Sequence, residues 1–135
     1  LPGMDWKHAA APSLDDFAAL ARAAFDALPQ PFKGLAGDVV IRVDDFADDE
    51  TLKMMDMEDP FELTGLYFGV DLGARDSMGP AAEPSRIFLY RRPILDEWAE
   101  HGEVTLGEMV AHVLIHEIGH HFGLTDDDID TIEAD

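Results

Sequence analysis

Residues 112–128 read HVLIHEIGHHFGLTDDD, and this stretch decides both the fold and the chemistry that we expect. Apolar residues before and within it recur at helical spacing, which predicts a helix with one buried face. Thr105 and Glu108 form a T-x-x-E capping box at the expected start, and Gly123 suits the left-handed residue that follows a helix end. The buried stripe is expected to consist of Met109, Val110, Val113, Leu114 and Ile118.

Two histidines of this helix are spaced to share a metal ion. His116 and His120 are separated by about 400° of rotation and about 6 Å along the axis, so both imidazoles lie on one face. The sequence contains no cysteine, which leaves His, Asp and Glu as ligands and favours zinc. After a turn at Gly123, Asp126 can return as the third ligand. Such a set leaves the fourth position of a tetrahedral zinc ion open, as in catalytic sites, so we expect one zinc ion per chain.

Glu117 follows the first histidine directly, so it is expected beside the metal and not on it. In that position it can accept a proton from a water molecule that the metal holds, and so act as a general base. The alternative is that both histidines are ordinary surface or core residues of a helix. The joint presence of Glu117, Gly123 and Asp126 at fixed offsets favours the metal site.

The neighbouring polar residues have weaker claims on the site. His112 lies one turn earlier on the metal face, where a hydrogen bond at the helix surface is favoured over support of a ligand. His121 is expected to pack or to cap the helix end. Asp127 and Asp128 compete with Asp126 as the third ligand, but the spacing favours Asp126.

The rest of the chain predicts an α+β fold. Ser13 caps an amphipathic helix that Pro29 and Pro31 end. The buried face of this helix is expected to hold Phe17, Leu20, Ala21, Ala24, Phe25 and Leu28. Further along, the sequence predicts strands at 38–43, 63–72 and 86–90, helical turns within 48–57, a turn at 58–61, a loop at 76–85, a helix from Pro93 to about His101, and a short helix from a Thr125 and Asp128 cap to the C-terminus.

Composition limits the class of protein and its partners. With 135 residues, 47% of them apolar, the chain is expected to form a single globular domain over residues 1–135. The net charge of −20 argues against nucleic acid and anionic membranes as partners. It is explained by solubility or high salt, or more specifically by a cationic partner or substrate. Nine acidic residues against the single Lys53 lie in residues 44–62, either as a solvated face or as a selector of cationic residues.

No apolar run is long enough to cross a bilayer, so we expect a cytoplasmic protein. Leu1 is not a start methionine, so the original N-terminus is expected to be missing, and a removed signal peptide stays an alternative.

The motif H-E-x-x-H-x-x-G-x-x-D, formed by His116, Glu117, His120, Gly123 and Asp126, resembles the zincin metallopeptidases. In particular, the chain resembles the small, single-domain bacterial zincin-like group called minimal metallopeptidases, which share a "GLY" segment and an "IxLYRRP"-like strand. The resemblance implies a zincin-like α+β fold, in which a small mixed or antiparallel sheet packs against the helix with the HExxH motif. It also implies zinc held by His116, His120 and Asp126, with Glu117 as the general base for hydrolysis of peptide bonds.

The chain departs from the larger zincin groups in several ways. Metzincins usually have histidine where this chain has Asp126, and they have a methionine turn downstream, whereas all six methionines here precede Asp126. A gluzincin ligand from a later helix would have to be Glu133, which is close in sequence to His120 and competes with Asp126. We expect no separate C-terminal subdomain of the kind that usually forms the far wall of a zincin cleft.

Further contacts with a substrate stay open at the sequence level. Tyr67 and Tyr90 are candidate donors to an oxyanion, although each is also explained as a half-buried strand aromatic. The segment 64–69, TGLYFG, is either an edge strand that pairs with an extended peptide or an ordinary sheet edge. A zinc metallopeptidase is the favoured function, and a non-enzymatic zinc-binding domain that acts through protein–protein interaction is the rival. A zincin-like ribonuclease is disfavoured by Glu117 and by the negative charge.

Overall fold

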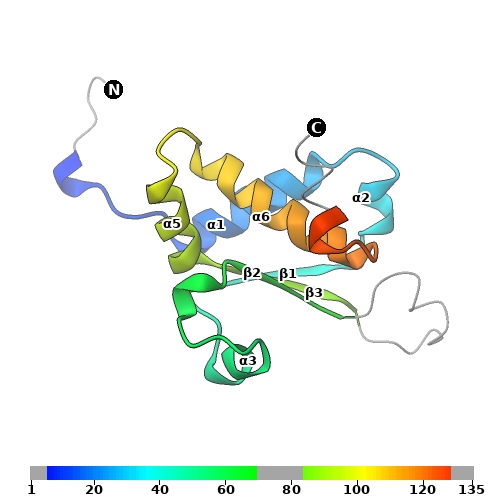
Figure 1. Cartoon of the computed structure of the whole chain (residues 1–135). Helices are drawn as coiled ribbons and strands as arrows, with labels where there is room; N and C mark the ends of the chain where they lie inside the picture. Colours follow the sequence, from blue (N-terminus) through cyan, green and yellow to red (C-terminus); the bar gives the residue numbers. More distant parts are fainter. Residues whose placement is uncertain (1–5, 70–83, 129–135) are drawn as a thin grey trace.

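The computed structural model describes residues 6–69 and 84–128, and its strands form a three-stranded mixed sheet (Figure 1). The strands are β1 (Val40–Asp44), β2 (Gly65–Phe68) and β3 (Arg86–Tyr90), in the order β1-β3-β2. The central strand β3 runs parallel to β1 and antiparallel to β2, with Ile41 opposite Ile87 and Gly65 opposite Leu89. The strand β2 is therefore an edge strand.

Two helices cover one face of this sheet. The helices α1 (Leu14–Asp26) and α6 (Leu106–His121) lie side by side across it, and α6 also contacts β2. Ile87 and Leu89 alternate along β3 and are fully buried against these helices. The α-helical stripes predicted from the sequence are confirmed in this main cluster, whose buried members are Phe17, Ala21, Phe25, Ala36, Val39, Ile87, Leu89, Ile94, Met109, Val110, Val113, Leu114 and Ile118.

The acid-rich segment, residues 44–62, covers the opposite face of the sheet. It contains α3 (Asp49–Met54) and a 3₁₀ turn at Pro60–Glu62, as predicted. Phe88 and Tyr90, which alternate with the main-core residues of β3, pack on this side. This smaller cluster has the buried members Ala47, Leu52, Leu63, Leu66 and Tyr90.

Both long helices begin at the capping boxes that the sequence predicts. The Ser13 hydroxyl accepts a hydrogen bond from the Asp16 backbone N–H at 3.1 Å, and the Asp16 carboxylate accepts one from the Ser13 N–H at 2.9 Å. Thr105 and Glu108 repeat the pattern at the start of α6. Each box satisfies backbone donors that a helix start would otherwise leave without a partner.

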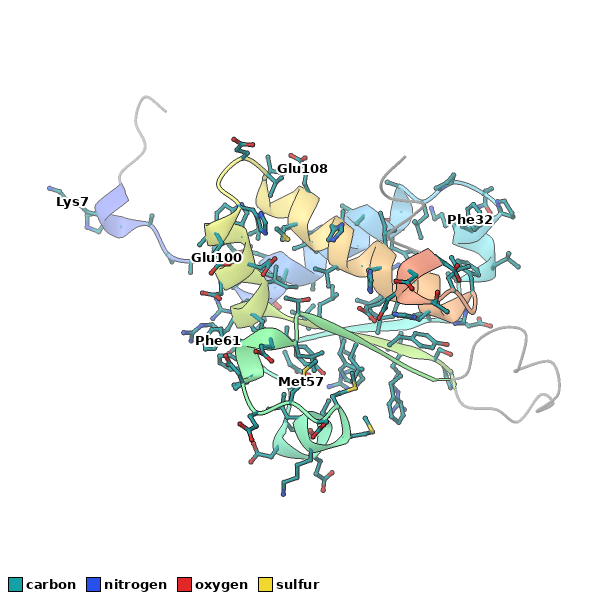
Figure 2. The ribbon with its side chains drawn as sticks, in the orientation of Figure 1. Lys7, Phe32, Met57, Phe61, Glu100 and Glu108 are labelled. Carbon is teal, nitrogen blue, oxygen red and sulfur yellow. The ribbon has the colours of Figure 1, made fainter. Side chains whose placement is uncertain are left out.

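Some boundaries differ from the expectation. The helix α5 (Arg91–Glu100) begins two residues before Pro93, which is tolerated because first-turn N–H groups need no helical acceptor. Two short helices were not predicted: a 3₁₀ turn at Trp6–His8, and α2 (Phe32–Leu35) after Pro31. In α2, Phe32 extends toward the end of α6 and packs edge-on against Phe122, with ring centroids 5.6 Å apart (Figure 2).

Other expectations fall outside the described residues. Residues 70–72 of the predicted strand, most of the loop predicted at 76–85, the end of the helix predicted after Thr125, and Glu133 lie outside the described residues. Within the described ranges, no helix is long and apolar enough to span a bilayer.

The strand β2 approaches α6 closely at Gly65. A β-carbon placed there would lie 2.7 Å from Val113 Cγ1, 3.3 Å from Glu117 Cγ and 3.3 Å from the Phe88 carbonyl oxygen. The β-branched Val113 side chain has little freedom to move away. A glycine is therefore required for the observed distance between strand and helix.

We predict that Gly65→Ala lowers the free energy of unfolding by about 1–3 kcal/mol, because the added methyl group overpacks this contact. Gly102→Ala is the matched control, since a β-carbon at Gly102 meets nothing within 4 Å. Urea unfolding of both variants measures the difference. Equal stability of the two variants would contradict the close-contact argument.

Candidate metal centre

The helix α6 ends in a left-handed turn that brings the chain back toward its last two helical turns. Gly123 has φ +82°, its N–H donates to the His120 carbonyl at 2.9 Å, and the Leu124 N–H donates to the Gly119 carbonyl at 3.1 Å. These two bonds form a Schellman motif, which confirms the role predicted for Gly123. The reversal places Asp126 next to the histidines of α6.

Three predicted ligand residues converge after this turn. Asp126 Oδ1 lies 3.0 Å from His116 Nε2 and 3.0 Å from His120 Nε2. The two imidazole rings are nearly perpendicular, with centroids 5.3 Å apart. Among the described residues, this is the group of three whose ligand atoms all lie within 4.8 Å of one another.

The tautomer of His120 indicates what the group can bind. His120 Nδ1 lies 3.0 Å from the Leu124 carbonyl oxygen, which can only accept, so Nδ1 carries a hydrogen. In neutral His120 the lone pair on Nε2 then faces the carboxylate oxygen of Asp126. Two such atoms 3.0 Å apart repel each other unless a proton or a metal ion lies between them, and metal-binding histidines commonly donate their other N–H to a carbonyl in this way. The donor set therefore fits a divalent metal such as zinc.

Glu117 lies beside this group in the contact between α6 and β2. Its side chain is 8% exposed, and its carboxylate accepts a hydrogen bond from the backbone N–H of Tyr67. Burial raises the pKa of the Glu117 carboxyl above its ordinary value, and the nearby His120 and His116 oppose this rise only in part. The carboxylate is thus held by the edge strand, close to the candidate ligands.

These residues line a cleft of about 580 Å³ between α6, the edge strand β2 and the acid-rich segment. The strand register shows which backbone groups of β2 face this cleft. The Tyr90 N–H donates to the Thr64 carbonyl, so Thr64 bonds to β3, and the N–H and C=O groups of every second residue after Thr64, starting with the next one, point away from β3. Those are the groups of Gly65 and Tyr67, and both residues line the cleft. Sequence reasoning missed Met55 and Met57 on the opposite wall, because their periodicity indicates only a short helix.

The two candidate tyrosines have different surroundings. Tyr67 lines the cleft, and its hydroxyl lies 2.8 Å from Ser85 Oγ and 2.9 Å from His121 Nδ1. Ser85 and His121 are both almost fully buried, which agrees with a packing role for His121. Tyr90 is 3% exposed in the smaller cluster, and burial with the charges of Asp44 and Asp48 raises its pKa to about 12. Tyr90 does not line the metal cleft; a substrate contact by either tyrosine stays a prediction.

The other polar neighbours lie outside the group of three. His112 is exposed on α6 and lines a different cavity. Asp128 forms the expected cap: the Thr125 N–H donates to its carboxylate at 3.0 Å, and its own N–H donates to the Thr125 hydroxyl at 3.2 Å. These hydrogen bonds lower the pKa of Asp128. Asp127 is exposed and does not belong to the group.

Comparison with known proteins agrees with this geometry. The family model described as "zincin-like metallopeptidase" matches residues 36–135, which include the whole sheet and the complete motif from His116 to Asp126. Among curated proteins, none matches this chain.

We predict that the Tyr67 hydroxyl stabilises the junction of α6 with the sheet. Tyr67→Phe should lower the free energy of unfolding by about 1–3 kcal/mol, because it leaves Ser85 and His121 with a buried polar atom less well satisfied. In a double-mutant cycle with Ser85→Ala, the two losses should be non-additive by roughly 0.5 kcal/mol or more, measured by urea unfolding. Simple additivity would mean that the two hydroxyls act independently.

Proposed function

Because the chain belongs to the zincin-like metallopeptidase family, we propose that it hydrolyses peptide bonds with one zinc ion held by His116, His120 and Asp126. The convergence of these three side chains, with the Nε2 atom of His120 and the Asp126 carboxylate facing each other at 3.0 Å, is the observation that carries the proposal. Zinc bound there would supply a Lewis acid that polarises a carbonyl and acidifies water.

Glu117 is the proposed general base. It follows a candidate ligand on α6 and lines the same cleft, so its carboxylate can take a proton from the attacking water and return it to the leaving amine. The Tyr67 N–H supports this role by fixing the orientation of the carboxylate. Glu117 thus transfers the proton from the attacking water to the leaving amine, and its side chain has little freedom to rotate.

The substrate is proposed to bind as an extended peptide along β2. The N–H and C=O groups of Gly65 and the C=O group of Tyr67 face the cleft, and an edge strand offers such outward groups to an added strand, while the Tyr67 N–H is taken by Glu117. Antiparallel addition is favoured because it is the more stable pairing. The Tyr67 hydroxyl, held by the buried Ser85 and His121, would have to leave them to act as the donor to the oxyanion.

The metal content of the purified protein should be tested first, by mass spectrometry. The expected result is about one zinc per chain, lost in both His116→Ala and Asp126→Ala. His112→Ala is the matched control, because His112 lies on the same helix outside the group of three. Absence of metal after incubation with zinc would contradict the proposed site, and loss of zinc in the control would show that the ligand set is incomplete.

Replacement of the base separates binding from catalysis. Glu117→Gln should keep one zinc per chain and lower kcat for peptide hydrolysis by about 10²–10⁴-fold, because the amide cannot accept the proton. Cleavage of a synthetic peptide pool, followed by mass spectrometry, measures the effect. Undiminished turnover in this variant would remove Glu117 from the mechanism.

A non-enzymatic zinc-binding domain is the second candidate. It is favoured by the position of Asp126, which lies after the end of α6, so that a metal would connect the following segment to the helix. Under this alternative, chelation would unfold the domain and zinc-loaded protein would cleave no member of the pool.

A further inference from the structure

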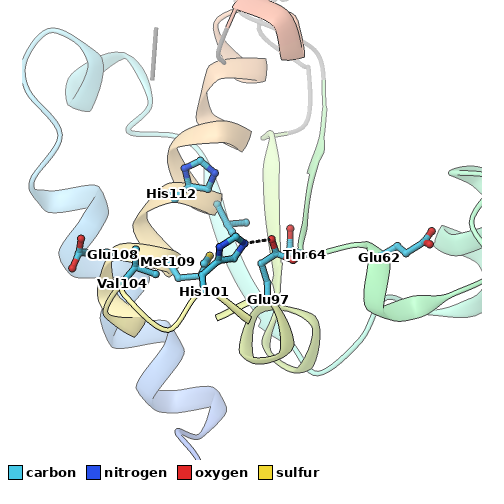
Figure 3. Close-up of a pocket in the computed structure, with 9 residues that line it drawn as sticks. Glu62, Thr64, Glu97, His101, Val104, Glu108, Met109 and His112 are labelled. Atoms are coloured by element: carbon cyan, nitrogen blue, oxygen red, sulfur yellow. Dashed lines mark hydrogen bonds and ion pairs between the residues drawn. The ribbon is translucent and has the colours of Figure 1, made fainter. Parts of the chain in front are cut away.

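A second cavity, of about 570 Å³, adjoins the metal cleft (Figure 3). Glu62 and Thr64, which precede β2, line both cavities, so the two meet at the start of the edge strand. The remaining walls come from α5, from the connection between α5 and α6, and from the first half of α6. An extended peptide that follows β2 out of the metal cleft in this direction reaches the second cavity.

The wall of this cavity combines apolar and acidic groups. Met109 and Val113 are buried and contribute apolar surface. Glu62, Glu97 and Glu108 are exposed and contribute carboxylates. Glu97 extends from α5 toward Thr64, where it contacts His101 at 3.1 Å (Figure 3).

The basic side chains among the described residues that line this cavity are two histidines, His101 and His112. Neither lysine nor arginine is among the described residues that line the cavity. The ion pairs of Arg22, Lys33 and Arg91 in the described ranges go to Asp26 or Asp45. The cavity therefore keeps a negative potential on its rim.

The arrangement fits a long cationic side chain better than a metal ion. The carboxylates of the second cavity do not belong to a group of three ligand atoms within 4.8 Å, so they are too dispersed to hold a small ion together. A lysine or arginine side chain instead has an apolar stem and a charged end. The stem matches Met109 and Val113, and the charged end matches Glu97.

The direction of β2 fixes which part of a substrate arrives there. Gly65 packs on Val113, and the Tyr67 hydroxyl lies near His121, so β2 runs in the same direction as α6. An antiparallel peptide runs from Tyr67 toward Thr64. The residues that follow the scissile bond are therefore the ones that enter the second cavity.

We infer that the second cavity is a subsite for a lysine or arginine side chain on the carboxyl-terminal side of the scissile bond. The inference rests on the proposed peptidase function, and it assigns the substrate class: peptides with a basic residue shortly after the cleavage point. Glu97 is the residue that determines this specificity.

Hydrolysis of a randomised synthetic peptide library by the zinc-loaded protein tests the inference. Lysine and arginine should be enriched in the first two residues after the cleavage point. Glu97→Gln should lower kcat/KM about three- to fivefold for a peptide with arginine there, the scale of an exposed ion pair, and leave its glutamine counterpart unchanged. Glu100→Gln is the matched control: Glu100 ends the same helix, is exposed and lines neither cavity (Figure 2).

The opposite results overturn the inference while the peptidase function stands. These are cleavage without a preference for basic residues, enrichment only before the cleavage point, or equal effects of Glu97→Gln and Glu100→Gln. The last result would mean that net charge alone attracts the peptide.

A binding measurement keeps the two proposals separable. Zinc-loaded Glu117→Gln should bind a fluorescein-labelled arginine peptide more tightly than its glutamine counterpart, by fluorescence anisotropy at low salt. Adding Glu97→Gln should remove that difference, and adding Glu100→Gln should preserve it. If this preference is found but the unsubstituted zinc-loaded protein cleaves no peptide, the cationic subsite is supported and the peptidase function is rejected. Equal affinities for the two peptides would reject the subsite.

Discussion

The contact between α6 and the edge strand β2 determines the geometry of the site. Gly65 allows the strand backbone to approach Val113 and Glu117, and the Tyr67 N–H then reaches the Glu117 carboxylate. The same strand offers its outward peptide groups to the cleft, so the proposed base and the proposed peptide-binding edge are placed by one packing interaction. A larger spacing would separate the carboxylate from the strand.

The parts of the fold that depend on local sequence were predicted well. The caps at Ser13 and Thr105 and the turn at Gly123 require only residues a few positions apart, and each is present in the structure. The ligand spacing of His116 and His120 is local in the same sense. Membership of the zincin-like family is also readable from the sequence, because its motif lies in one continuous segment.

The parts that depend on distant contacts were not predictable in the same way. Periodicity identifies strands but not their order, so the parallel pairing of β1 with β3 and the edge position of β2 required the structure. The sequence also could not show that Tyr90 is buried behind the sheet while Tyr67 lines the cleft, since the two have the same chemistry. The short helix α2 was missed because four residues after a proline give no periodic signal.

The cleft has two walls of unequal stiffness, because different hydrophobic clusters lie behind them. The wall formed by α6 belongs to the main cluster, whereas Met55 and Met57 belong to the segment over the smaller one. Regions with fewer buried apolar contacts open locally at lower free energy, and methionine adapts its shape to its neighbours. We therefore expect amide hydrogens around α3 to exchange faster than those of β3 and α6. Substrates of different bulk would be accommodated on that compliant side, while the ligand residues on α6 keep their positions.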